Sequence, residues 1–161
     1  MAQEGSTELF IRRAHWRDFD AVASLVAQCG AGSLLPERRT LRRFRNIVHD
    51  LGNDLYLAFS RDVLVGLVHI VYVRELVAPR RAEISSIFVS PGVANVGVGE
   101  FLLSFARKRA QKRDCQVVVF RASESNRSVV PLLAAGGFRQ AGQWYVADLL
   151  QEEHPQGLKE G

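Results

Sequence analysis

Residues 82–106 read AEISSIFVSPGVANVGVGEFLLSFA, and no other segment says as much about the architecture of this chain. An apolar run, residues 84–89, ends at Ser90-Pro91, and a glycine-bearing loop, residues 92–99, leads directly into an apolar helical pattern. The first turn of a helix has backbone N–H groups without partners and a partly positive dipole end, and glycine lets a ligand approach closely. The segment therefore predicts a site for a diphosphate-bearing cofactor.

Two common phosphate-binding motifs do not fit this loop. Gly92 and Gly97 have the spacing of a P-loop, but Val98 stands where that motif needs a lysine. A dinucleotide fingerprint that begins at Gly97 would need its third glycine at Leu102. The cofactor must therefore be held by another arrangement of strand, loop and helix.

The segment resembles motif A of the GNAT superfamily of N-acetyltransferases. That motif is a strand that often ends in Val-x-Pro, a loop of the form [Gln/Arg]-x-x-Gly-x-[Gly/Ala], and a helix that opens with paired leucines. Val89-Ser90-Pro91, Gly97-Val98-Gly99 and Leu102-Leu103 match it in register. Ala94 departs from it, because the first loop position is usually Arg or Gln.

The resemblance extends over most of the chain, from about residue 9 to residue 146. Residues 10–14 followed by Asp18 resemble the first strand and helix of the superfamily, and residues 55–68 resemble its second and third strands. Asn126 and Gly136-Gly137-Phe138 resemble motif B. We therefore expect one domain, residues 9–150, with loose tails at residues 1–8 and 151–161.

Composition is that of a globular protein without a membrane span. The 161 residues are 47% hydrophobic and 24% charged, and no apolar stretch reaches the roughly 18 residues that a spanning helix needs. The N-terminus is polar and is not a signal peptide. Cys29 and Cys115 lack metal-ligand spacing and are expected to be packed rather than reactive. These features favour a cytoplasmic protein without a metal site.

The order of elements predicts an α/β fold with helices on both faces of the sheet. The resemblance implies a mixed, mostly antiparallel central sheet in which two parallel strands, 82–89 and 115–121, splay apart and admit the arm of acetyl-CoA. The other expected strands are 8–13, 55–60, 63–74 and 143–149, and the expected helices are 18–29, 37–51, the segment from the glycine loop to 113, and 126–135. Leu41, Phe44, Val48 and Leu51 form the expected apolar stripe of the second helix.

The resemblance places the cofactor, acetyl-CoA, on this framework. The backbone of Phe88 and Val89, with Ile87 as the neighbouring alternative, would pair with the amides of the cofactor arm, and a bulge in that strand would leave an N–H group to polarise the thioester carbonyl. Asn126 would bind the arm, cap a helix, or do both. The pyrophosphate would accept hydrogen bonds from the backbone of Ala94, Asn95, Val96, Gly97, Val98, Gly99 and Glu100.

Acid–base chemistry needs a group to take the amine proton and another to protonate the leaving thiolate. Glu83, acting through water, is the expected base, and Glu124 is the second candidate for that role. Alternatively, Glu83 has a structural role only and forms an ion pair with Arg80 or Arg81. Many relatives place a tyrosine acid seven residues after the motif B asparagine, where this chain has Leu133, beside the expected cofactor position. Tyr145 or water would then supply that proton.

Acceptor-side residues are less defined. His69 and Tyr72 are candidates to line the acceptor pocket, and one of Ser85 and Ser86 is expected to face the cleft, although a lone strand histidine is more often structural. The net charge is +4 and the isoelectric point about 9.5, with arginines gathered in residues 38–45. That helix is interpreted as a solvated face that helps admit an acidic acceptor rather than as a nucleic-acid surface.

The resemblance implies an enzyme that moves acetyl from acetyl-CoA to a primary amine of a small molecule or peptide by direct attack. Two alternatives remain open: a non-catalytic acyl-CoA-binding sensor, favoured by Ala94 and Leu133, and an interaction domain that has lost the ligand. No nucleic-acid or membrane partner is expected. Since members of the superfamily often dimerise, a homodimer is also open.

Overall fold

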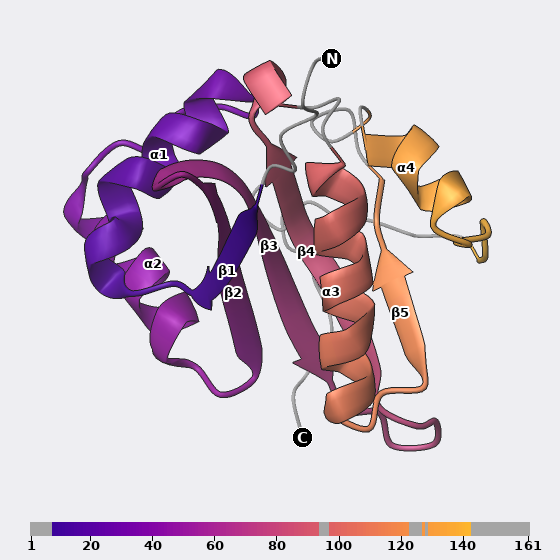
Figure 1. Cartoon of the computed structure of the whole chain (residues 1–161). Coiled ribbons are helices and arrows are strands. Elements are labelled where there is room, and N and C mark those ends of the chain that lie inside the picture. Colours follow the sequence, from indigo (N-terminus) through magenta and orange to yellow (C-terminus); the bar gives the residue numbers. More distant parts are fainter. Residues whose placement is uncertain (1–7, 94–96, 123–126, 128, 143–161) are drawn as a thin grey trace, which may run out of the picture.

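The structure is a computed structural model that describes residues 8–93, 97–122, 127 and 129–142. These residues form an α/β fold around a five-stranded sheet in the order β1-β2-β3-β4-β5 (Figure 1). Neighbours from β1 to β4 are antiparallel, and β5 is parallel to β4. The strands are β1 (Leu9–Arg13), β2 (Asn53–Ser60), β3 (Val63–Val73), β4 (Arg81–Val89) and β5 (Val117–Phe120). Among the described residues, β1 lies at one edge of the sheet and β5 at the other.

Helices cover both faces of the sheet, as the sequence predicted. The short helix η1 (Trp16–Asp18), α1 (Phe19–Gln28) and α2 (Arg38–His49) lie on one face. The glycine-loop helix α3 (Val98–Lys112) lies on the other face, against β3 and β4, and α4 (Val130–Ala135) packs beside it (Figure 1). The one-turn helix η2 (Pro91–Val93) follows β4. None of the helices in the described part of the chain is both long and apolar enough to span a bilayer.

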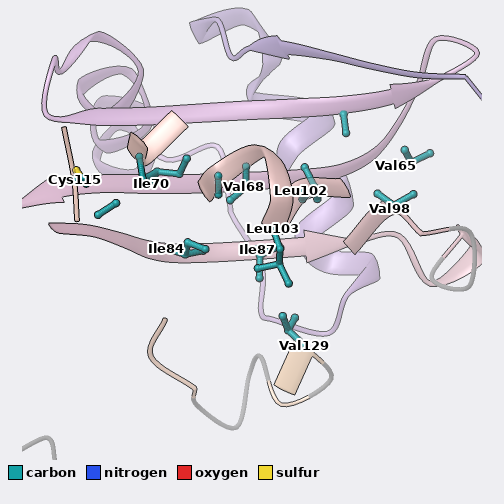
Figure 2. Packing of buried hydrophobic residues seen from close by; sticks show 14 residues of the cluster. Val65, Val68, Ile70, Ile84, Ile87, Val98, Leu102, Leu103, Cys115 and Val129 are labelled. Carbon is teal, nitrogen blue, oxygen red and sulfur yellow. The ribbon is translucent and has the colours of Figure 1, made fainter. Parts of the chain in front are cut away.

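The main core lies between the sheet and α3. Figure 2 shows Val68, Ile70, Ile84, Ile87 and Leu102 gathered in it, and each is almost fully buried. Removal of this apolar surface from water is the main force that holds α3 on the sheet. A Cβ atom at Gly66 of β3 would lie 2.9 Å from Leu102 Cδ1, so glycine at this position allows the helix to lie close to the strand.

A second core lies under α1 and α2. Phe19 and Phe44 meet edge to face with ring centroids 5.5 Å apart, above Leu57 and Leu67. The expected stripe of α2 is only half correct, because Phe44 and Val48 are buried whereas Leu41 and Leu51 are 40% and 78% exposed. The helix ends at His49, and the Asp50 side chain accepts a hydrogen bond from the Gly52 backbone at 2.8 Å. This turn removes Leu51 from the helical face.

The helix of motif B includes α4, residues Val130–Ala135, and its expected start near residue 126 lies outside the described residues. Pro131 lies in its first turn, where the missing N–H group costs no helical hydrogen bond. At its end Gly137 has φ +77°, and the Phe138 and Gly137 N–H groups donate to the carbonyls of Leu133 and Ala134 at 2.9 and 3.2 Å. Those two bonds form a Schellman cap and explain the Gly-Gly-Phe sequence. The expected strand 143–149 and both tails lie outside the described residues, apart from Glu8.

Candidate functional site

The two parallel strands part in the middle of β4. Pairing between β4 and β5 runs from Arg81 to Ile84 and stops there, although β4 continues to Val89. At the same point the register with β3 shifts, since His69 pairs with Ser86 and Ile70 pairs with Ile84. Ser85 therefore has no partner on β3 and forms a bulge, which bends the strand. The expected bulge is present and lies slightly nearer the start of β4 than the expected Ile87 and Phe88.

Beyond the bulge, β4 has no neighbouring strand on its β5 side among the described residues. Ile87 is 1% exposed and points into the core under α3, while Phe88 packs toward the core under α1 and α2. Backbone groups on this side of the strand require a partner other than the sheet. The Val89 carbonyl has one, because the Cys29 thiol donates to it over 3.2 Å. Burial raises the pKa of Cys29, which keeps that thiol a donor rather than a thiolate.

The first turn of α3 lies beside the end of β4. Gly97 caps the helix with φ +75° and is exposed, and a Cβ atom there would meet nothing within 4 Å. The first helical hydrogen bond runs from the Phe101 N–H group to the Gly97 carbonyl at 3.0 Å. The N–H groups of Val98, Gly99 and Glu100 precede that bond and have no helical acceptor. The remaining expected phosphate-binding residues, Ala94, Asn95 and Val96, lie outside the described residues.

Glycine is needed at positions 97 and 99 of this turn for two different structural reasons. Gly97 holds a left-handed conformation that other residues adopt only at a cost. Gly99 is buried, and a Cβ atom there would lie 2.4 Å from Cδ1 of Leu132 in α4. The sequence predicted that both glycines allow close approach to a ligand, but packing of α4 on α3 accounts for Gly99.

Glu83 lies on the α1–α2 face of β4, before the bulge. Its side chain is 15% exposed, and its Oε1 atom accepts a hydrogen bond from Arg121 Nη2 at 3.2 Å. The expected partners are engaged elsewhere, since Arg81 pairs with Glu75 and Arg80 donates to a backbone carbonyl. Arg121 was missed from the sequence. Its position directly after β5 was the available signal, because the carboxyl end of a parallel strand is where site residues gather.

His69 lies on the same face of the sheet as Glu83. Its Nε2 atom is 2.7 Å from Oδ1 of Asn53, and burial lowers the pKa of the imidazole, so the neutral ring donates to the Asn53 carbonyl oxygen. Ser86 pairs with His69 and shares this face, whereas Ser85 is the exposed bulge residue. Tyr72 lies on the opposite face, so the expectation that it lines one pocket with His69 is wrong. Residues three apart on a strand point to opposite sides.

The sequence model of the acetyltransferase (GNAT) family matches residues 11–138, most of the chain. This chain belongs to the GNAT family. No curated protein sequence matches it significantly.

Solved structures resemble this GNAT chain at low sequence identity. A ribosomal-protein-alanine N-acetyltransferase from Brucella melitensis is 19% identical with a TM-score of 0.73, over 88% of this chain and 99% of that one. An aminoglycoside N-acetyltransferase in complex with CoA is 17% identical with a TM-score of 0.75, over 92% and 98%. An acetyltransferase from Clostridium acetobutylicum with acetyl-CoA is 17% identical with a TM-score of 0.72, over 91% and 100%. At these identities the likeness establishes the shared fold.

Leu133 of this GNAT domain lies in α4, half-buried, and packs against the core under α3. Its side chain has no dissociable proton, so the described part of α4 provides no acid at that position. The other expected site residues, Asn126, Tyr145 and Glu124, lie outside the described residues.

A buried ionic cluster joins α3 to the sheet of this GNAT domain. Asp54 is completely buried and accepts hydrogen bonds from the Tyr72 hydroxyl at 2.7 Å and Arg109 Nη2 at 3.0 Å. Arg113 and Arg13 lie 3.4 and 3.5 Å from its other oxygen. Burial and the Asp54 charge raise the pKa of Tyr72, which therefore stays protonated as a donor. The cluster lies on the α3 face, away from Glu83, and was not predicted.

Proposed function

We propose that this protein transfers the acetyl group of acetyl-CoA to a primary amine by direct attack of that amine on the thioester. The observation that carries the proposal is the parting of β4 from β5 at Ser85, beside the first turn of α3. One face of this opening offers strand edge for amide pairing, and the other offers unpaired helical N–H groups for a diphosphate. A CoA thioester has both chemical groups, an amide-bearing arm and a diphosphate.

Residues on the open side of β4 would hold the cofactor arm, and α3 would hold its diphosphate. The backbone of Ile87 and Val89 would pair with the arm as an added strand, because Phe88 pairs with Leu67 of β3, and the Val89 carbonyl is already bound to Cys29. The N–H groups of Val98, Gly99 and Glu100 would donate to the phosphate oxygens. When bound, acetyl-CoA supplies the thioester carbonyl that the amine attacks.

Glu83 would take the proton that the amine loses, through a water molecule, while the Arg121 hydrogen bond fixes the orientation of its carboxylate. The new C–N bond forms as the C–S bond breaks, and Tyr145 or water would protonate the leaving thiolate, because Leu133 cannot. Neither cysteine suits an acyl-enzyme mechanism, since burial raises the pKa of both Cys29 and Cys115. This supports direct transfer to the amine.

A non-catalytic acyl-CoA-binding module is the second candidate, and Leu133 favours it. The two candidates share the cofactor site and differ only in turnover. Without a tyrosine at position 133 the thiolate of CoA remains a tolerable leaving group, so transfer is slowed rather than prevented. Enzyme activity is therefore the better-supported proposal.

Calorimetric titration with acetyl-CoA tests the cofactor site, with CoA and ATP as controls. Binding of acetyl-CoA and CoA but not of ATP is the expected result, and equal binding of ATP would contradict the assignment. Release of free thiol with a panel of amines then tests transfer. Binding without amine-dependent thiol release would favour the sensor, and absence of any CoA binding would leave an interaction domain.

A further inference from the structure

Helix α2 carries an unusual charge for its position. Five exposed arginines project from its 12 residues. We call them the basic face of α2; they are Arg38, Arg39, Arg42, Arg43 and Arg45. Arg38 and Arg39 lie in the first turn, which has no acidic residue, at the end where the helix dipole disfavours cations. The like charges within each pair spaced by four residues, Arg38–Arg42 and Arg39–Arg43, repel each other as well. Helix stability therefore does not explain this sequence.

The basic face of α2 makes no ion pair within the described residues. Carboxylates of those residues pair instead with arginines elsewhere, on β1, β4, α3 and after β5. Arg45 lies over the Trp16 ring at 5.6 Å, and Arg17 lies over the same ring at 5.0 Å. Four of the five guanidinium groups, those other than Arg45, thus have no described counter-ion or ring. A ligand with several negative charges would relieve their repulsion.

An open groove runs beside this face, between α2 and the start of β2. It encloses about 660 Å³ and is lined by Arg39, Arg42, Arg43, Asn46 and Asn53, among others. At its end Asn53 holds His69, and Asn53 pairs across the sheet with Val71, which pairs with Glu83. Asn53 and Glu83 are therefore in one row on the same face, two strands or roughly 10 Å apart. The groove leads toward the proposed base.

We propose that the acceptor is an acidic polypeptide that docks in extended form along the basic face of α2 and presents its amine toward Glu83. The acceptor assignment rests on the proposed function; the docking does not. Arginines four apart on a helix are about 6 Å apart along its axis, and alternate side chains of an extended peptide are about 6.6 Å apart. Carboxylates at every second position therefore match the rows Arg38–Arg42 and Arg39–Arg43. Guanidinium groups bind carboxylates in bidentate fashion.

A peptide suits this surface better than a nucleic acid does. The exposed aromatic ring beside α2 is Trp16, and a base that stacked on it would compete with the guanidinium groups of Arg17 and Arg45, which lie over the same ring. The groove is also lined by the side-chain amides of Asn46 and Asn53, which can both donate to and accept from peptide groups.

The docking is tested by fluorescence anisotropy with a labelled peptide of alternating glutamate and serine, without acetyl-CoA. Three proteins are compared: the wild type, Arg39→Gln/Arg43→Gln, and a matched variant, Lys108→Gln/Lys112→Gln, which loses the same charge from exposed positions on α3. The first variant should bind about tenfold more weakly, and the second should bind as the wild type does. Equal weakening by both variants, no binding by the wild type, or tighter binding of single-stranded RNA of equal charge would each overturn the proposal.

Acetyl transfer separates this proposal from the proposed function. With acetyl-CoA, peptides that carry a free amine and the acidic repeat should have a KM at least tenfold lower than peptides with the repeat replaced by serine, and the difference should vanish in Arg39→Gln/Arg43→Gln. Transfer to both peptides with equal KM would refute the acidic acceptor and leave the transferase. Peptide binding without any transfer would refute the transferase and leave the docking surface.

Discussion

Leu132 of α4 occupies the space that a side chain at Gly99 of α3 would need. A Cβ atom at residue 99 would lie 2.4 Å from Leu132 Cδ1, and contact at this distance forces one helix to move. The first turn of α3 is where the proposed diphosphate site lies. The position of α4 and the shape of that turn are therefore linked through one van der Waals contact.

Gly99→Ala should destabilise the protein by about 1–3 kcal/mol, because the added methyl group overpacks this contact. In a Leu132→Ala background, Gly99→Ala should cost at least about 1 kcal/mol less than it does in the wild type, since the leucine no longer opposes the methyl group. Urea unfolding of the wild type, both single variants and the double variant measures this coupling. Additive effects would show that the two residues do not meet.

Gly97 allows a test of the diphosphate site with a matched pair of variants. Gly97→Gln and Gly97→Glu impose the same left-handed strain, about 1–2 kcal/mol, and place side chains of equal size in open space. They differ in charge alone. The glutamate variant should bind acetyl-CoA about tenfold more weakly than the glutamine variant in calorimetry, because its carboxylate repels the phosphates. Equal affinities would remove the first turn of α3 as the diphosphate site.

Glu83→Gln should lower kcat about 100-fold below the pKa of the acceptor amine and leave the affinity for acetyl-CoA unchanged, as expected for loss of a general base. Glu75→Gln is the matched control. Glu75 also pairs with an arginine near the start of β4 but lies in the loop before it. Its replacement should leave kcat unchanged. A pH–rate profile that is the same for Glu83→Gln and the wild type would exclude Glu83 as the base.

Asp54→Asn should cost about 3–5 kcal/mol, because it leaves the charges of Arg109 and Arg113 without their buried partner. Asp18→Asn removes a carboxylate with a more exposed arginine partner, since Arg12 is 38% exposed, and should cost less. Chemical denaturation of both variants gives the comparison. Similar costs for the two would mean that the Asp54 cluster contributes no more than a surface ion pair.

His69 gives the free energy of unfolding a predictable dependence on pH. Burial holds its pKa in the folded state below the unfolded value of about 6.5, so the unfolded chain binds the proton more readily. The neutral His69 contributes fully to the free energy of unfolding above the unfolded pKa of about 6.5, and this contribution is lost as the pH falls through the pKa of the folded state. His69→Gln keeps a donor toward Asn53, and its stability should fall less between pH 7.5 and 5.5 in urea titrations. Exposed His49→Gln should retain the wild-type slope.

The parts of the fold that follow local rules could be predicted from the sequence. The strand and the helix of residues 82–106 were correct, because strand patterning and helix-end chemistry act over a few residues, although the helix begins at Val98, within the expected loop. The two-residue turn at Arg61 and Asp62 was correct for the same reason, and both residues have positive φ. The expected α2 stripe failed at Leu51, where the Asp50–Gly52 hydrogen bond ended the helix first.

Contacts between distant residues could not be predicted. The structural alternative for Glu83 was an ion pair with Arg80 or Arg81, its neighbours in sequence, but its partner is Arg121, which the parallel pairing of β4 with β5 brings close. Asp54 directly precedes the expected strand 55–60, yet it is buried beneath α3, where it contacts arginines more than 50 residues away in sequence. Single-sequence patterns contain no information on such pairings.

The unpaired stretch of β4 also bears on how this protein behaves before it meets a ligand. Residues 85–89 read SSIFV, without a charge or a proline, and these are the devices that usually keep an exposed strand from pairing with another molecule. Preparations stripped of CoA compounds are therefore expected to self-associate through the open side of this stretch, and the N–H groups on that side, those of Ile87 and Val89, should exchange faster than those that pair with β3. A bound thioester would then cover the open side of β4 as well as serve as co-substrate, and so would keep the protein monomeric in solution.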